Sequence, residues 1–299
     1  MDRLQGMRTF VAVADAAGFA PAARRLNTSP PSVTRAVAEL EQRLGARLLH
    51  RTTRSVRLTE AGRRYLADCR RILAEIEDAE RQAAGQETVP RGLVTLTAPV
   101  MLGRIVVVPA VLDLLARYAE IRVSTIFVDR VVHLVDEGID VAVRIADLPD
   151  SSLVAVRVGQ VRRVLCASPG YLDARGRPTR PADLAAHAVI DFVNLTPNGE
   201  WSLIEDGRRR AFRPRARLQT GSADAAIAAA CAGHGITRVL SYMIASAVER
   251  GELEVVLEDF TPPAVPVHVV HKELGRTSSR VRTVVDHLAE HLRRHPALA

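Results

Sequence analysis

Three histidines near the end of the chain have a spacing that could hold a metal ion. His287, His291 and His295 lie at positions i, i+4 and i+8 of a predicted helix, so their rings would share one face. In the sequence, no carboxylate or cysteine completes a convincing ligand set with them, and Cys231 with His234 is an equally weak pair. We therefore expect surface histidines and predict no metal site.

Cysteine chemistry is a second possibility. The chain holds three isolated cysteines, Cys69, Cys166 and Cys231, and an odd number without paired spacing does not indicate a disulfide framework. We expect small buried thiols in a reducing compartment. A redox-active pair stays the alternative, because thiol reactivity depends on the local pKa, which a sequence does not reveal.

Motifs of the common enzyme classes are missing from the sequence. It contains no GxxxxGK[ST], no GxSxG and no HExxH, so we predict that the protein is not an enzyme and needs no cofactor. The apolar stretch at 105–116 contains Pro109 and Asp113 and is far shorter than the ~20 residues of a membrane span. The first residues do not resemble a secretory signal. We therefore expect a cytoplasmic protein with no membrane partner.

Positive charge is concentrated in one part of the chain. The first 64 residues hold twelve arginines and five acidic residues, which accounts for the whole formal net charge of +7. The remaining residues are neutral as a group. A basic segment beside a neutral body is typical of proteins that bind a polyanion.

Within the basic segment, two helices are predicted to be joined by a tight turn. A short helix begins near Pro21, and residues 27–29 form the turn, with Ser29 as the N-cap of the next helix. Pro30 and Pro31 then occupy the first turn of that helix, where a residue without an N–H group costs little. The two prolines therefore fix where the helix begins.

This third helix is predicted to be amphipathic. Its buried stripe would consist of Val33, Val37, Leu40 and Leu44. Its opposite face would carry Pro31, Arg35, Ala38 and Gln42, with Thr34 at the edge. A helix-turn-helix with an exposed Thr-Arg pair near the start of the second helix fits the major groove of DNA, where such residues face the base edges.

A basic hairpin is predicted after Gly45 ends the helix. Residues 46–59 should form a strand, a turn and a strand, from which Arg51, Arg54 and Arg57 project. A basic hairpin beside a helix-turn-helix is typical of a wing, and an arginine at its tip can enter the minor groove. The alternative is a small solvated helical domain with scattered arginines, which would not explain the order of elements or the uneven charge.

A heptad pattern follows the hairpin. Thr59 is positioned to cap a helix, and apolar or small residues then recur at alternating spacings of four and three: Tyr65, Cys69, Ile72, Ile76, Ala79 and Ala83. Such a narrow stripe predicts a helix that pairs with a second copy, although packing within one chain is the alternative. A dimer would present two recognition helices to half-sites about 34 Å apart. Residues 85–92 have the composition of a linker.

Strands and helices are predicted to alternate in the neutral body, residues 91–299. We expect strands at 93–96, 121–128 and 141–146, a loop at 99–103, and helices at 105–118, 130–140 and 222–235. Residues 201–219 should form a hairpin that turns at Asp206-Gly207. This alternation predicts parallel, doubly wound sheets. Two half-domains of that type create a cleft in which small ligands bind.

These segments together resemble the LysR-type transcriptional regulators. The matching segments are RTFVAVADAAGFAPAARRL, PPSVTRAVAELEQRLGARLLHRTTRSVRLTEAG, GIDVAVRIADLPDSSLVAVRVG, RRVLCASPGYLDARGRPTRPADLAAH and GELEVVLEDFTPPAVPVHVVH. The resemblance covers almost the whole chain. It implies a winged helix-turn-helix domain at 1–58, a linker and dimerisation helix with a hinge at 59–90, and an α/β effector-binding domain like that of periplasmic binding proteins. The subdomains of that domain would be 91–161 with 266–299, and 162–265.

The resemblance also implies which residues act. In addition to Arg51 of the hairpin, DNA contacts would fall on Pro30, Pro31, Thr34, Arg35 and Arg54. Effector contacts would fall on Ala98, Pro99, Val100, Met101, Val128, Arg144 and Ser222. Many relatives have glutamine at position 30, so base readout here is expected to rest more on Thr34 and Arg35, and on the DNA shape sensed by Arg54. The loop after the first strand of the body is apolar, whereas several relatives have Ser or Thr there.

Two groups of arginines keep open interpretations. Arg144 could pair with an anionic effector or with a nearby carboxylate, Asp140 or Asp147. The six arginines between 208 and 217 could form a second DNA-binding patch, although their alternation along a hairpin favours a solvated edge.

The sequence therefore predicts a sequence-specific transcription regulator that binds double-stranded operator DNA, as a homodimer or homotetramer, under the control of a small-molecule effector. The alternative is a cytosolic two-lobed small-molecule-binding protein or enzyme whose basic head serves only oligomerisation. DNA affinity that falls steeply with salt would distinguish the first from the second.

Overall fold

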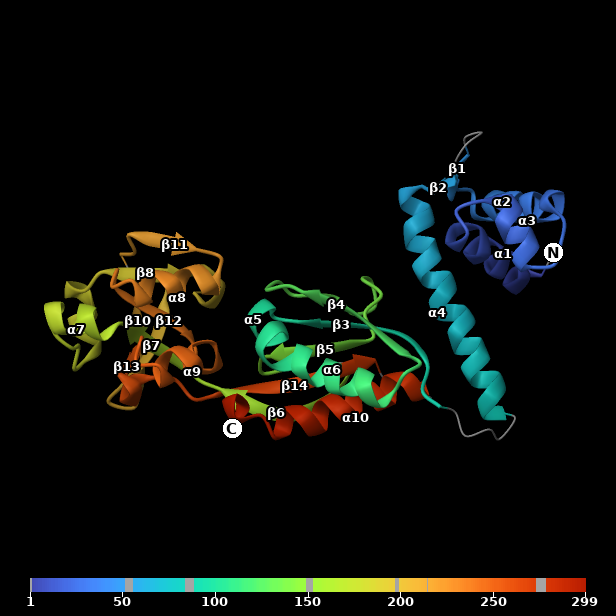
Figure 1. The fold of residues 1–299 in the computed structure, drawn as a ribbon. Helices are drawn as coiled ribbons and strands as arrows, with labels where there is room; N and C mark the ends of the chain where they lie inside the picture. The colour runs from blue at the N-terminus through green and yellow to red at the C-terminus, as the bar shows by residue number, and fades with distance from the viewer. Residues whose placement is uncertain are drawn as a thin grey trace. The chain divides into compact units, whose positions relative to one another are not determined.

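The computed structural model describes residues 2–51, 56–83, 89–148, 153–196, 199–213, 215–272 and 278–299. The chain divides into two compact units: Met1–Leu93 with Ser278–Arg280, and Val94–Thr277 with Val281–Ala299. Among the described residues, no helix has both the length and the apolar character needed to span a membrane. Figure 1 shows the elements of each unit.

The first unit is a winged helix-turn-helix domain followed by a long helix (Figure 1). Its elements are α1 (Arg3–Asp15), α2 (Phe19–Arg25), α3 (Pro30–Leu44), β1 (Leu49–Arg51), β2 (Val56–Leu58) and α4 (Glu60–Ala83). The strands β1 and β2 are antiparallel, with Leu49 opposite Leu58. The predicted order of helix, turn, helix, hairpin and long helix is confirmed.

Capping residues set both ends of α3. The Ser29 hydroxyl accepts a hydrogen bond from the Ser32 N–H at 3.3 Å, and the two prolines occupy the first helical positions. Gly45 ends the helix in the left-handed conformation, with φ of 64°. Val33, Val37 and Leu40 are buried as predicted. The prediction for Leu44 is wrong: its side chain is 41% exposed, because α3 ends there and the chain turns away at Gly45.

The core of the first unit also includes the beginning of α4. Cys69 is fully buried, and Leu66 and Leu73 join it against Phe10 and Val13 of α1. Tyr65 and Ile72 pack on the same cluster, and the rings of Tyr65 and Phe10 lie 5.8 Å apart. The first half of the predicted heptad stripe is thus packed within its own chain.

The second unit contains a five-stranded sheet with the strand order β4-β3-β5-β14-β6. Its elements are β3 (Gly92–Ala98), α5 (Val100–Leu102), the π-helical turn η1 (Gly103–Val107), α6 (Val108–Arg117), β4 (Ile121–Phe127), β5 (Val141–Ile145), β6 (Leu153–Val161), β14 (Val265–Lys272) and α10 (Ser279–Arg293). Leu114 of α6 and Leu288 of α10 are fully buried in a core shared with Leu96 and Val267 of the sheet.

A second five-stranded sheet has the order β11-β8-β12-β7-β13. Its elements are β7 (Arg163–Ala167), α7 (Pro169–Arg175), β8 (Val189–Phe192), the short turn η3 (Val193–Leu195), β11 (Leu218–Thr220), α8 (Ala223–Cys231), β12 (Ile236–Leu240), α9 (Ser241–Glu249) and β13 (Glu254–Val256). A separate hairpin, β9 (Trp201–Glu205) and β10 (Arg208–Phe212), turns at Asp206 and Gly207, which both have positive φ. The predicted hairpin turn is confirmed.

Both large sheets are mixed, so the prediction of purely parallel sheets is wrong. The strand β14 runs antiparallel to its neighbours β5 and β6, and β12 and β13 run antiparallel to β7. The long strands β6 and β14 are neighbours in the first sheet, although more than 100 residues separate them. Other neighbours are parallel: β3 with β5, and β8 with both β11 and β12.

Two local predictions in the second unit are also wrong. Residues 99–103 were expected to be a loop, but a helix begins at Val100, because Asp129 accepts a hydrogen bond from the Val100 N–H at 2.9 Å and caps it. Residues 130–140 were expected to be a helix, but turns occupy 134–138. There Arg130 and Glu137 pair at 2.6 Å, and Gly138 has φ of 65°. That ion pair and that glycine favour a compact turn.

The prediction of surface histidines on the carboxyl-terminal helix is wrong for His287. His287 is 9% exposed, and its Nε2 lies 3.0 Å from the carbonyl oxygen of Ala110 on α6. The helices α6 and α10 lie side by side (Figure 1). Spacing along α10 correctly placed His287 and His291 on one face, but it did not reveal that this face meets α6.

Candidate nucleic-acid interface and ligand pocket

The outer face of α3 presents Thr34 and Arg35 near the beginning of the helix. Both are exposed. The Thr34 hydroxyl donates to the Pro30 carbonyl at 2.9 Å, so its free lone pairs and its methyl group are what remain available to a partner. Among the described residues, the Arg35 guanidinium takes part in no ion pair. A free guanidinium on such a face can donate two hydrogen bonds to a guanine.

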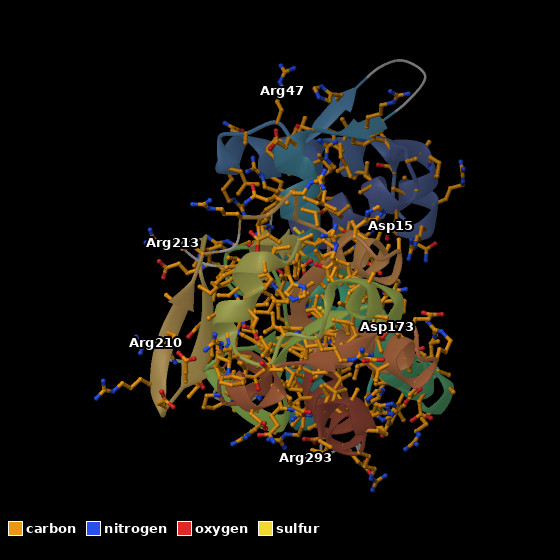
Figure 2. All side chains as sticks on the ribbon, turned by 90° about the vertical axis from the view of Figure 1, so that its left-hand side faces the viewer. Asp15, Arg47, Asp173, Arg210, Arg213 and Arg293 are labelled. Carbon is orange, nitrogen blue, oxygen red and sulfur yellow. The ribbon has the colours of Figure 1, made fainter. Side chains whose placement is uncertain are left out.

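The first unit carries further exposed arginines. Those of the first unit with described side chains include Arg3, Arg8, Arg24, Arg25, Arg47, Arg57, Arg63 and Arg64. Figure 2 shows Arg47 pointing away from the ribbon. Arg25 is less available to a partner, because it lies 3.7 Å from Asp15. Asp15 also pairs with Arg70, and this pair joins α4 to α1. Arg54, and the side chain of Arg51, lie outside the described residues.

The hairpin is attached to the recognition helix by a carboxylate. Glu41 of α3 accepts hydrogen bonds from the Leu48 N–H at 2.7 Å and the Leu49 N–H at 3.1 Å. Thr59, at the other end of the hairpin, donates to the Arg47 carbonyl at 2.7 Å and caps α4 by accepting from the Gly62 N–H at 2.9 Å. These bonds hold α3, the hairpin strands and α4 in one arrangement.

The second unit contains a pocket of about 480 Å³. Its walls come from both five-stranded sheets: the ends of β3 and β5 and the segment 128–132 on one side, and β7, η3, β12 and α9 on the other. Apolar residues form much of the wall: Ala98, Pro99, Val128, Val131, Val132, Val143, Ile145, Phe192, Leu195, Leu240 and Met243. A pocket of this size and lining suits a small organic molecule.

Polar groups in the pocket wall include two half-buried arginines. Arg144 donates to the Val132 carbonyl at 2.5 Å and makes no ion pair among the described residues, so neither Asp140 nor Asp147 is its partner there. Arg163 lines the opposite wall, where burial lowers its pKa and the nearby charge of Asp147 opposes that shift. Both side chains can therefore offer N–H donors to an anion.

Tyr242 and Asn194 add neutral polar groups to the same wall. The Tyr242 side chain is buried, and burial, together with the charge of Asp129, raises its pKa, so its hydroxyl stays protonated. The Asn194 amide donates to the Gly221 carbonyl at 3.1 Å and keeps its own carbonyl oxygen as an acceptor. The wall thus combines charged donors, a hydroxyl and an amide oxygen with the carboxylates of Asp129 and Asp147.

The structure brings together only part of the predicted effector site. Ala98, Pro99, Val128 and Arg144 line the pocket, whereas Val100, Met101 and Ser222 do not. Met101 is buried in the core, and Val100 supplies its N–H to Asp129. Ser222 caps α8 by accepting a hydrogen bond from the Ala225 N–H at 3.3 Å.

Several residues of the pocket wall were not predicted from the sequence. Arg163, Asn194 and Tyr242 come from the second sheet and its helices, far along the chain from the first strand of the body. Arg163 directly precedes the apolar segment VLCA, and a charged residue at the start of a buried strand is a weak sign of a site. Nothing local marked Tyr242, because an aromatic residue on an apolar helix is usually part of a core.

Family models match both parts of the chain. The model described as "Bacterial regulatory helix-turn-helix protein, lysR family" matches residues 4–63, and the "LysR substrate binding domain" matches residues 87–293. The chain belongs to the LysR family of transcriptional regulators. As a LysR-type regulator it has a DNA-binding and an effector-binding domain.

Relatives and solved structures agree with membership of the LysR family. The chain is 32% identical over 292 residues to the HTH-type transcriptional activator AaeR of Escherichia coli K12, covering 97% of this chain and 94% of that one. It is 33% identical over 300 residues to the repressor PA14_22550 of Pseudomonas aeruginosa UCBPP-PA14, covering 100% and 95%. CrgA of Neisseria meningitidis, a LysR-type transcriptional regulator, superposes with a TM-score of 0.63 at 26% identity, covering 98% of this chain and 99% of that one.

A second full-length structure supports the same architecture. The virulence activator AphB of Vibrio cholerae matches with a TM-score of 0.62 at 25% identity, covering 97% of this chain and 99% of that one. Like these LysR-type proteins, the present chain combines an amino-terminal helix-turn-helix with a two-subdomain α/β regulatory domain.

Proposed function

We propose that this LysR-type regulator reads the bases of operator DNA through Thr34 and Arg35 of α3. Pro30 and Pro31 would contact the DNA backbone, and Arg51 and Arg54 would contact DNA from the wing. The observation that carries this proposal is the exposed Thr34–Arg35 pair at the start of a helix whose opposite face is buried. Arg35 can contact guanine, and Thr34 can accept from a base amino group or pack on a thymine methyl.

The test of this interface compares two arginine variants of the full-length protein. A tight-binding duplex would first be selected from a random pool, and fluorescence anisotropy would then measure affinity for it and for a scrambled duplex. Arg35→Ala should cost about 1–3 kcal/mol on the selected duplex and reduce the preference over the scrambled one. Arg47→Ala should weaken both duplexes about equally. A preserved preference in Arg35→Ala would refute the assignment.

We propose further that the 480 Å³ pocket binds the effector. Arg144 and Arg163 on opposite walls favour a small molecule that carries an anionic group, while the apolar wall favours a compact hydrocarbon body. A ligand that contacts both walls would stabilise one arrangement of the two sheets over another. It can regulate DNA binding only through that difference in affinity.

A thermal-shift screen of small carboxylates and neutral analogues against the full-length protein tests the pocket. Arg163→Ala and Arg144→Ala should lose most of the shift given by a carboxylate hit, because the anionic group would lose a charged donor. Arg122→Ala, an exposed arginine on β4, serves as the matched control and should keep the shift. Retention of the shift in both pocket variants would place the effector elsewhere.

For assembly, we propose a homodimer, and by pairing of dimers a homotetramer, in which the second half of α4 supplies the seam. Tyr65, Cys69 and Ile72 already pack within the chain, so Ile76, Ala79 and Ala83 would be the positions left for a partner. The side chains of Ala79 and Ala83 lie outside the described part of the structure. A dimer would place two α3 helices on two half-sites of a palindromic operator.

A further inference from the structure

A carboxylate and two histidines meet where α6 lies against α10, and none of the three lines the proposed effector pocket. Asp113 comes from α6, and His287 and His291 come from α10. One potential ligand atom from each residue lies within 4.8 Å of those of the other two. The Asp113 Oδ2 to His287 Nε2 distance is 3.4 Å. Residues far apart in the sequence are thus gathered into one cluster.

The two histidines are held in compatible positions. They are one turn apart on α10, and their rings are stacked, with centroids 6.3 Å apart and an interplanar angle of 28°. The buried His287 ring is oriented by its Nε2 contact with the Ala110 carbonyl at 3.0 Å. The same Nε2 lies 3.4 Å from Asp113 Oδ2, so a metal held between those two atoms would replace the contact with Ala110.

The cluster borders a cavity of about 340 Å³ that contains additional donors. Its wall includes Glu290 and His295 as well as the three clustered residues. Arg117 pairs with Asp113 at 2.9 Å, and Arg294 pairs with Glu290 at 2.9 Å. Each carboxylate therefore already has an arginine partner.

We propose that Asp113, His287 and His291 form a binding site for a divalent transition-metal cation, with Zn²⁺, Co²⁺ and Ni²⁺ as the class of ligand. Two imidazoles and one carboxylate are a donor set that these ions accept, whereas Mg²⁺ and Ca²⁺ prefer oxygen alone. Metal–ligand bonds of ~2.1 Å in a tetrahedral arrangement put donor atoms about 3.4 Å apart. Asp113 Oδ2 and His287 Nε2 are at that separation, so Nε2 is the nitrogen placed to coordinate, and rotation of the half-exposed His291 can bring in the third donor.

Binding of the cation has defined consequences for the neighbouring groups. The Asp113 carboxylate would exchange its Arg117 partner for the metal, which limits the affinity. Coordination through His287 Nε2 moves the ring proton to Nδ1 and breaks the contact of Nε2 with Ala110. Water, Glu290 or His295 would complete the coordination sphere. Because the ligands come from two helices, the metal would fasten α6 to α10.

The test uses untagged full-length protein and Co²⁺, whose visible absorption reports the coordination geometry. Wild-type protein freed of metal should bind one Co²⁺ per chain with saturable visible bands, and Zn²⁺ should displace it. His291→Ala and Asp113→Asn should each weaken binding at least about ten-fold, because each removes one of three protein ligands. His234→Ala, an exposed histidine elsewhere in the second unit, should bind like wild type.

Two results would overturn the proposal. One is the absence of saturable binding at one Co²⁺ per chain in the wild-type protein. The other is unchanged affinity in His291→Ala, whose half-exposed side chain makes it the variant expected to fold normally. Circular dichroism of each variant confirms folding, and if Asp113→Asn is unfolded, His291→Ala alone decides. Isothermal titration with Zn²⁺ gives an independent value of affinity and stoichiometry.

Discussion

At the scale of single residues, a close backbone contact joins α4 to the segment before β1 in the first unit. Gly62, in the first turn of α4, packs on the segment that precedes β1, and a Cβ at this position would lie 2.0 Å from the Leu48 carbonyl oxygen. Only glycine allows that approach. The same carbonyl accepts a hydrogen bond from the Thr59 N–H at 2.9 Å, so the backbone there has little freedom to move away.

Gly62→Ala should therefore destabilise the first unit by about 1–3 kcal/mol, the usual cost of overpacking a tight site. Thermal unfolding followed by circular dichroism would show it. Trp201, the only tryptophan in the chain, is fully buried in the second unit, so its fluorescence should report an unchanged transition. The control is Gly170→Ala, because nothing lies within 4 Å of a Cβ built there. Equal stability of the two variants would contradict the prediction.

A single histidine should also couple stability to pH. Burial, followed by the charge of Arg157, lowers the pKa of His268 below its ordinary value of 6.5. The unfolded chain then binds a proton at a higher pH than the folded chain does, so stability is lost as pH falls below about 6.5. The pKa values of His187, His287 and His295 are lowered as well. The contribution of His268 alone must therefore be measured with a variant.

His268→Asn should flatten the pH dependence of stability between pH 7.5 and pH 5.5 relative to the wild type, because one group that resists protonation in the folded state is removed. Denaturant unfolding of the second unit, followed by Trp201 fluorescence at several pH values, measures it. His234→Asn, at an exposed position, is the control and should keep the wild-type slope. A slope in His268→Asn as steep as in the wild type would contradict the assignment.

At the scale of elements, α4 completes the core of its own unit, and we propose that it also pairs with a second copy. Its first turns complete the core of the first unit through Cys69, Leu66 and Leu73, which are nearly or fully buried. Burial raises the pKa of the Cys69 thiol to about 11, so this cysteine is an inert core residue near neutral pH. The heptad pattern continues past Leu73, the last described residue of α4 in that buried cluster. We therefore propose that the later turns form the seam with a partner.

Ile76→Asp should weaken dimerisation without unfolding the first unit, because a charge in the seam is costly only when a partner helix covers it. Sedimentation equilibrium measures the dimer, and circular dichroism measures the fold. Glu80→Ala, on the exposed side of α4, is the control and should leave both unchanged. Cys69→Asp should instead unfold the domain. If Ile76→Asp remains as dimeric as the wild type, the seam lies elsewhere.

At the scale of the whole molecule, charge is divided between the units. The entire surplus of +7 lies in the first 64 residues. In the second unit, arginines tend to be balanced locally: Arg210 lies 3.7 Å from Glu205, and Arg213 lies 2.7 Å from Glu200. Figure 2 shows Arg210 and Arg213 on the outside of the hairpin region. This local balance favours a solvated edge over a second DNA-binding patch.

DNA affinity should therefore fall steeply with salt through the first unit alone. Replacing Arg35, Arg47 and Arg57 together by alanine should reduce the slope of log K against log salt by about one for each of these arginines that binds a phosphate. Replacing Arg208, Arg209 and Arg210 together should leave the slope at its wild-type value. Anisotropy of a labelled duplex at salt concentrations from about 50 to about 300 mM measures both slopes. A slope reduced by the hairpin triple would show that the body also binds DNA.

The sequence by itself determined the features that depend on local pattern. Prolines and caps set the start of α3, helical spacing set its buried and exposed faces, and Asp206-Gly207 set the hairpin turn, because each is governed by neighbours within a few residues. The order of these elements, together with a net positive charge confined to the first 64 residues, was enough to predict a DNA-binding regulator. The errors at 99–103 and 130–140 arose where a distant or tertiary partner, such as Asp129 for Val100, decides the local conformation.

Only the tertiary structure decided which distant residues share a surface. It folded the start of the heptad stripe onto α1, brought Arg163 and Tyr242 to the pocket that Arg144 lines, and placed Asp113 beside His287 and His291. It also made the sheets mixed, through strands that return from the other half of the domain. Long-range packing of this kind leaves no periodic trace in the chain, because the partners are separated by tens to hundreds of residues and are chosen by shape and burial.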